Sequence, residues 1–173
     1  IQSYMKKIIF VTLSLWLATF ASLAENRNVD TRNIINTISE YKHVLGFRVV
    51  SVGKAGLGLV KTVARISAES EEDKAALAML NGINKVVVVK YEKAKEKKQN
   101  EFSSALSDLF NDAEKILEVK DEEDTVNIYG TSVNGGESID DLMIFMPEEY
   151  TLVCILGSIN ADGIADLIKI ADE

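Results

Sequence analysis

The chain has 173 residues, 47% of them hydrophobic, and a formal charge of −8 at pH 7. This length fits one domain with a substantial core. The acidic surface would repel a phosphate backbone, so nucleic acid is not expected as a partner. Cys154 is the single cysteine, which rules out an internal disulfide. Because it stands in an apolar run, we expect it to be a small buried residue.

The first 24 residues are interpreted as separate from the folded protein. Residues 1–4 are assigned as vector or upstream residues. Met5–Ala24 have the layout of a secretory signal peptide, with two lysines, an apolar run and small residues before Glu25. Cleavage after Ala24 would export the protein to the periplasm or the cell envelope. Residues 25–173 would then form a single α+β domain.

The apolar run of this segment, residues 8–23, is also compatible with a retained membrane anchor. It is shorter than the roughly 20 residues that a membrane-spanning helix needs. We therefore expect no integral membrane segment after cleavage. The segment holds two of the 19 basic residues and no acidic one, so the remaining chain has 17 basic and 27 acidic side chains and a formal charge of −10.

Helices and strands alternate over the first two thirds of the remaining chain. Apolar residues at helical spacing predict helices, and runs of β-branched residues predict strands. In chain order the pattern gives a helix over 31–41, a strand over 47–52, helices over 54–66 and 70–80, a strand over 83–91 and a long helix over 100–119.

The last third predicts a three-strand antiparallel meander followed by a helix. The expected strands are 125–129, 142–146 and 150–156, with turns at Asn134-Gly135 and Pro147 and a final helix beginning at residue 160 or 162. Strands joined through helices tend to be parallel. The sequence therefore predicts an α+β two-layer sandwich, in which helices pack on a mixed five-stranded sheet.

Several segments carry a family resemblance. They are a helix, glycine and short strand over 38–52, followed by Leu80–Val88, Val126–Gly130 and Leu156–Asn160. With these segments the chain resembles domain-of-unknown-function family 4252, a family of small exported bacterial envelope proteins. The resemblance implies a signal-bearing envelope protein and supplies no activity or catalytic residue. Some members look like lipoproteins, but no cysteine follows the signal segment here, so the resemblance does not extend to a lipid anchor.

Residues that build catalytic or metal centres are scarce. His43 is the single histidine, and its neighbours predict an exposed helix end, so neither a serine triad nor a histidine-based metal site is expected. The glycine-rich segment 53–62 has Leu59 where a phosphate loop needs lysine. Asp140 and Asp141 are adjacent in a predicted strand, so their side chains would point to opposite faces. We predict no catalytic residue, no cofactor and no metal.

The strands suggest a function. A sheet with helices on one face has alternating strands, yet the strands near Val86–Val89, Leu142–Met146 and Val153–Leu156 are apolar on both faces. Either the first or the last helix covers the second face, or that face binds a protein partner, a second copy or a small hydrophobic ligand. The candidate interaction surface comprises Met143, Phe145, Thr151, Val153 and Ile155.

The sequence therefore favours an exported envelope protein without catalytic activity, which acts as a binding or interaction module through an apolar sheet face. Two alternatives stay open. One is a carboxylate-dependent hydrolase of the periplasm, whose acidic residues would be brought together by the fold. The other is a regulatory sensor of the cell envelope.

Overall fold

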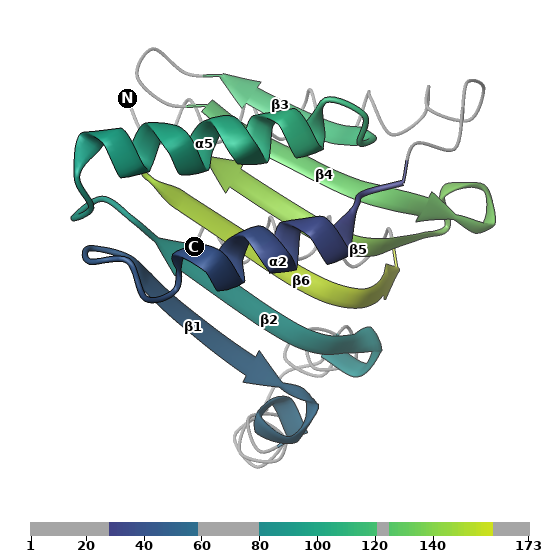
Figure 1. Ribbon diagram of the computed structural model, residues 1–173. Helices are drawn as coiled ribbons and strands as arrows, with labels where there is room; N and C mark the ends of the chain where they lie inside the picture. The colour runs from purple at the N-terminus through teal and green to yellow at the C-terminus, as the bar shows by residue number, and fades with distance from the viewer. Residues whose placement is uncertain (1–27, 59–79, 121–124, 161–173) are drawn as a thin grey trace, which may run out of the picture.

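The computed structural model describes residues 28–58, 80–120 and 125–160 (Figure 1). The predicted signal peptide and the predicted C-terminal helix lie outside these residues, as do most of the two helices predicted between residues 54 and 80. Every helix within the three described ranges is too short or too polar to cross a membrane.

A six-stranded sheet forms the centre of the structure. Its strands are β1 (Arg48–Gly53), β2 (Ile83–Lys90), β3 (Lys115–Lys120), β4 (Thr125–Val133), β5 (Ser138–Met146) and β6 (Thr151–Asn160). They lie in the order β1-β2-β6-β5-β4-β3, and each neighbouring pair is antiparallel (Figure 1). The α+β class is confirmed, whereas the predicted five strands and the predicted mixed pairing are wrong.

The additional strand is β3, which the sequence pattern assigned to the long helix over 100–119. The helix observed there, α5 (Glu96–Phe110), ends earlier in tight turns, where the Asn111 and Ala113 amides donate to the carbonyls of Asp108 and Phe110. The apolar residues beyond this turn continue the helical spacing by coincidence. They pair with β4 instead, because tertiary pairing outweighs local helix propensity.

The position of β6 explains why the sheet is antiparallel throughout. β6 lies between β2 and β5 and pairs with both, so the last strand of the sheet joins the β1-β2 pair to the β5-β4-β3 group. β1 and β2, although joined through residues 54–82, are direct antiparallel neighbours in an unbroken register. The predicted C-terminal meander is confirmed as β4-β5-β6, and Asn134 and Gly135 form its first turn with positive φ angles of 53° and 70°.

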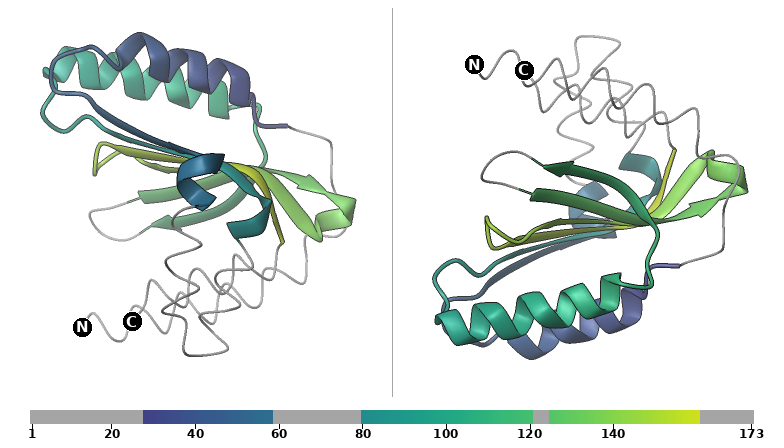
Figure 2. Two further views of the ribbon diagram at one scale, coloured as in Figure 1. Left: turned by 90° about the horizontal axis from the view of Figure 1, so that it is seen from below. Right: turned by 90° about the horizontal axis from the view of Figure 1, so that it is seen from above.

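Two helices pack side by side on one face of this sheet (Figure 2). The first is α2 (Thr31–Tyr41), which matches its predicted range and begins where Asp30 accepts a hydrogen bond from the Asn33 amide at 3.0 Å. The second is α5. We call this side the helix-covered face and the opposite side the second face. Because α2 lies on the helix-covered face, it does not cover the second face; the last helix, the other cover that the sequence suggested, lies outside the described residues.

An aromatic cluster fills the space between the two helices and the sheet. Phe102 of α5 has no exposed surface, and its ring centre lies 5.0 Å from that of Tyr41, 5.2 Å from that of Phe47 and 4.9 Å from that of Tyr91. These residues come from α2, the segment leading into β1, the end of β2 and α5. The cluster therefore fixes the start of β1 against both helices.

Replacing Phe102 with alanine is expected to lower the free energy of unfolding by about 3–5 kcal/mol, because the change leaves a cavity among three rings. Leu45→Ala is the matched control: Leu45 is 87% exposed, so its truncation should change stability by less than about 0.5 kcal/mol. Urea unfolding of both variants measures the difference. A loss below about 1 kcal/mol for the Phe102 variant would contradict the described packing.

Candidate interaction surface

Two of the five residues predicted to form an interaction surface lie beneath the helices. Met143 pairs with Cys154 in the sheet, and Phe145 pairs with Leu152. All four side chains are buried and belong to the apolar cluster under α2 and α5. Met143 and Phe145 are therefore core residues of the helix-covered face.

The other three residues lie on the opposite side. Thr151, Val153 and Ile155 alternate along β6 with the buried residues Leu152 and Cys154, which places them on the second face. Thr151 is buried and donates its hydroxyl hydrogen to the Glu149 carbonyl at 2.9 Å. Val153 and Ile155 are half-buried. The five residues thus form two separate groups on different faces of the sheet.

A row of aliphatic side chains crosses the second face from edge to edge. The strand registers align one residue from each strand: Val50, Val88, Val153, Ile144, Ile128 and Leu117. Ile128, in the interior of the sheet, is 9% exposed, whereas Val50 in β1 is 50% exposed. The apolar second face predicted from the sequence is therefore accessible at its β1 end.

β1 is an open edge of the sheet (Figure 1). It pairs with β2 on one side, and among the described residues no strand pairs with its other side. Residues 49–53 contain no charge and no proline, and all six residue pairs between β1 and β2 follow one register without a bulge. Between the basic residues Arg48 and Lys54 at its two ends, this regular and uncharged stretch presents unpaired backbone groups to any further strand.

The opposite edge, β3, is protected. Lys115 and Lys120 both form ion pairs with Glu118, and the register with β4 shifts between Lys115 and Leu117. Hydrogen bonds from Lys115 and then Lys120 lower the pKa of Glu118 from 4.5 to about 2. Charged side chains and bulges are the features by which proteins block edge-to-edge pairing. The two edges of this sheet therefore differ in their capacity to accept another strand.

Two turns meet beside the start of β1. Gly46 has a φ of +92°, and a Cβ atom there would collide with the backbone of Lys93 and Ala94. Only glycine fits this close approach without strain. The contact encloses a surface depression of about 190 Å³, lined by Gly46, Phe47, Arg48, Lys90, Glu92 and Lys93.

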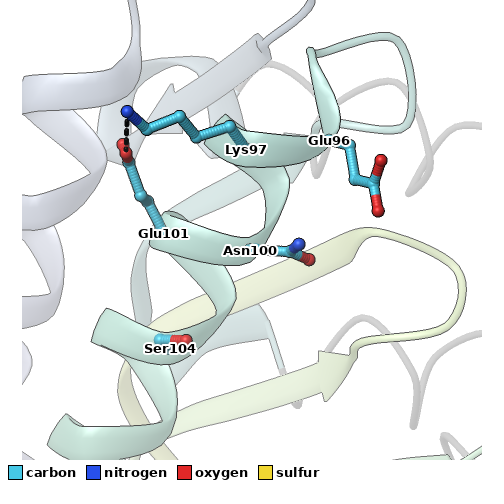
Figure 3. Close-up of a pocket in the computed structure, with 5 residues that line it drawn as sticks. All are labelled: Glu96, Lys97, Asn100, Glu101 and Ser104. Atoms are coloured by element: carbon cyan, nitrogen blue, oxygen red, sulfur yellow. Dashed lines mark ion pairs between the residues drawn. The ribbon is translucent and has the colours of Figure 1, made fainter.

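A second depression, of about 610 Å³, lies on α5 (Figure 3). Its lining residues, Glu96, Lys97, Asn100, Glu101 and Ser104, all project from this one helix. Lys97 and Glu101 form an ion pair at 3.9 Å, and Figure 3 places the Glu96 carboxylate away from it. A hydrogen bond from Lys98 lowers the pKa of Glu101. The depression is therefore a solvated, charged surface of a single helix, and no other helix or strand contributes a lining residue to it.

The surroundings of Cys154 do not suit nucleophilic chemistry. Cys154 is completely buried, as predicted, and burial raises the pKa of its thiol to about 12. The thiolate that a nucleophile requires is therefore strongly disfavoured at neutral pH. His43 is exposed at the end of α2, also as predicted.

Asp141 has a structural role that the sequence did not reveal. It occupies a bulge in β5 with a φ of +54°. Its carboxylate accepts hydrogen bonds from the Thr31 hydroxyl at 2.8 Å and from the Gly157 amide at 3.0 Å. Asp141 thereby ties the start of α2 to β6. The buried Oδ1 of Asp140 has no hydrogen-bond partner within the described part of the chain.

Comparison with known proteins identifies a family. Residues 41–167 match the family model described as a domain of unknown function (DUF4252). No curated protein and no solved structure matches the chain.

Replacing Glu118 with glutamine is expected to remove a pH-dependent contribution to stability. The folded state lowers the pKa of Glu118 from 4.5 to about 2, so its contribution is complete above about pH 4.5 and is lost as the pH falls through about 2. Because these side chains are partly exposed, the difference should stay below about 1 kcal/mol at pH 7. Urea unfolding between pH 7 and 2 measures it, with the exposed Glu137→Gln as control. A wild-type advantage that persists unchanged at pH 2 would exclude the ion pairs as its source.

Proposed function

The chain belongs to DUF4252, a family whose function is unknown, and we propose that it is an exported binding domain without catalytic activity. The binding surface is the open edge of β1 together with Val50, the exposed end of the aliphatic row. The proposed partner is a polypeptide. Export rests on the signal-like segment before Glu25, which directs the protein to the periplasm or the cell envelope.

The contrast between the two sheet edges carries this proposal. Both strands have basic residues at their ends, Arg48 in β1 and Lys115 and Lys120 in β3. In addition, β3 has the ion-paired Glu118 and a register shift, whereas β1 has an uninterrupted register and no charge between Val49 and Gly53. Exposed edges without protection favour pairing with another chain. An edge that is left open while its counterpart is blocked is therefore the natural place for a partner strand to add to the sheet.

The carboxyl groups of Glu101 and Glu118 do not favour the hydrolase alternative. A hydrolase that relies on a pair of carboxyl groups needs one whose pKa is raised, so that it can donate a proton near neutral pH. Glu101 and Glu118 have pKa values that neighbouring lysines lower, which stabilises both as carboxylates. Their environments suit ion pairing, and the proposal therefore assigns them no role in catalysis.

Site-specific photo-crosslinking tests where the partner binds. A benzophenone amino acid at position 50 should yield covalent adducts with another polypeptide in cells that produce the protein, because Val50 lies at the accessible end of the row. The same amino acid at position 120, exposed on the protected edge, is the matched control. Adducts at position 50 and none at position 120 are the expected result. Equal yields at both positions, or none at position 50, would refute the proposed surface.

Export is tested by determining the N-terminus of the protein recovered from cells. The expected product begins at Glu25 and fractionates with the periplasm or the envelope, because a signal peptidase cleaves after the small residue Ala24. Replacing Ala24 with a bulky residue such as tyrosine should slow this cleavage and lead to accumulation of the longer form. A wild-type protein that retains residues 5–24 in the membrane fraction would establish an anchor instead of a cleaved signal.

A further inference from the structure

We propose that the strand which binds to β1 is an acidic, extended segment of a different protein, added to the sheet edge through backbone hydrogen bonds. This inference rests on the proposed binding at the β1 edge and adds the chemistry of the partner. It follows from the charges around β1, which have the opposite sign to the net charge of the chain.

Basic residues surround β1 in an otherwise acidic protein. Arg48 begins the strand, Lys54 follows it, and Lys90 and Lys93 lie at the adjoining end of β2 and in the turn beyond it. All four are exposed. Among the described residues none of them takes part in an ion pair, whereas Lys97, Lys98, Lys115 and Lys120 all do. Exposed Glu92 lies beside three of these residues in the same surface depression, but no ion pair joins it to them in the described part of the chain, so the β1 edge carries a net positive charge.

The positions of these charges define the pattern of a complementary strand. Arg48, Val50 and Val52 share the second face, because side chains alternate along a strand, and Arg48 pairs directly with Lys90. A strand placed beside β1 would set its own alternate side chains opposite these residues. Apolar side chains would cover Val50 and Val52, and a carboxylate would face Arg48. A second carboxylate at the other end would lie near Lys54, which directly follows β1 at the start of a helical segment.

The same charges argue against a second copy of this chain as the occupant. In an antiparallel pairing of two β1 strands about Ser51, the Arg48 of each copy would lie near the Lys54 that directly follows β1 in the other copy. Like charges opposite each other across a strand pair are destabilising. Charge complementarity therefore selects an acidic strand from another protein.

The probe is an acetylated and amidated heptapeptide with the sequence ETVTVTE, which matches this pattern in the antiparallel direction. Two control peptides have one change each: KTVTVTK reverses the charge, and ETVPVTE keeps the charge but interrupts the strand. Binding is followed through the amide NMR signals of the purified protein, which also locate the bound peptide. We expect shifts concentrated in β1 and β2, with affinity for both control peptides lower by at least about tenfold.

Charge reversal on the protein supplies the matched test. The double variant Arg48→Glu and Lys90→Glu should lose at least about tenfold in affinity for ETVTVTE and should gain affinity for KTVTVTK. The control Lys97→Glu and Lys120→Glu makes the same change in net charge away from β1, and its affinity for ETVTVTE should stay within about twofold of the wild type. Unchanged amide signals outside β1 and β2 verify that the variants are folded.

The outcomes separate this inference from the proposed function. Equal binding of ETVTVTE and KTVTVTK, or no binding of either, would overturn the acidic-strand inference, while adducts of another protein at position 50 would leave the proposed function standing. Adducts between two copies of the chain, with a dimer in sedimentation that Val50→Lys abolishes, would overturn it in favour of self-pairing. Shifts that map to α5 in place of β1 would refute both the inference and the surface on which it rests.

Discussion

The central position of β6 is the constraint on which the rest of the structure depends. β6 is hydrogen-bonded to β2 on one side and to β5 on the other, so it joins two groups of strands that have no other direct pairing. Leu152 and Cys154 of this strand are completely buried beneath α2 and α5. Asp141 adds a polar connection, because its carboxylate joins the start of α2 to the backbone of β6. Because β6 occupies one side of β2, β1 pairs with the other side of β2 and forms the edge of the sheet.

Local sequence signals predicted the elements better than their arrangement. Periodicity and turn residues predicted the helix over 31–41 and five of the six strands. They also predicted the turn at Asn134-Gly135, because both residues tolerate the positive φ angles observed there. β3 was missed because Ile116 and Leu117 continue the spacing of the preceding helix, and only their pairing with β4 distinguishes the two states. The insertion of β6 beside β2 is a contact distant in sequence, which no local pattern encodes.

In the candidate surface, the strand register determines on which face of the sheet each side chain lies. Met146 pairs with Thr151 across the turn at Pro147, so between Leu142 and Met146 the odd-numbered residues of β5 pair with even-numbered residues of β6. Met143 and Phe145 consequently lie in the core, while Val153 lies on the second face. A turn longer or shorter by one residue would have placed them together. The open edge at Val50 was equally hidden from the sequence, because a β-branched run reads the same in a central strand and at an edge.

The difference between the two edges also limits how these molecules could assemble. A sheet with two open edges can add copies on both sides without end, which is the geometry of a fibril. Here the lysines and the ion-paired glutamate of β3 close one side. Two copies joined at β1 would therefore turn only their β3 edges outward, and no further copy could pair with them through those edges. A blocked β3 edge thus allows the β1 edge to stay open without the unlimited association of identical chains.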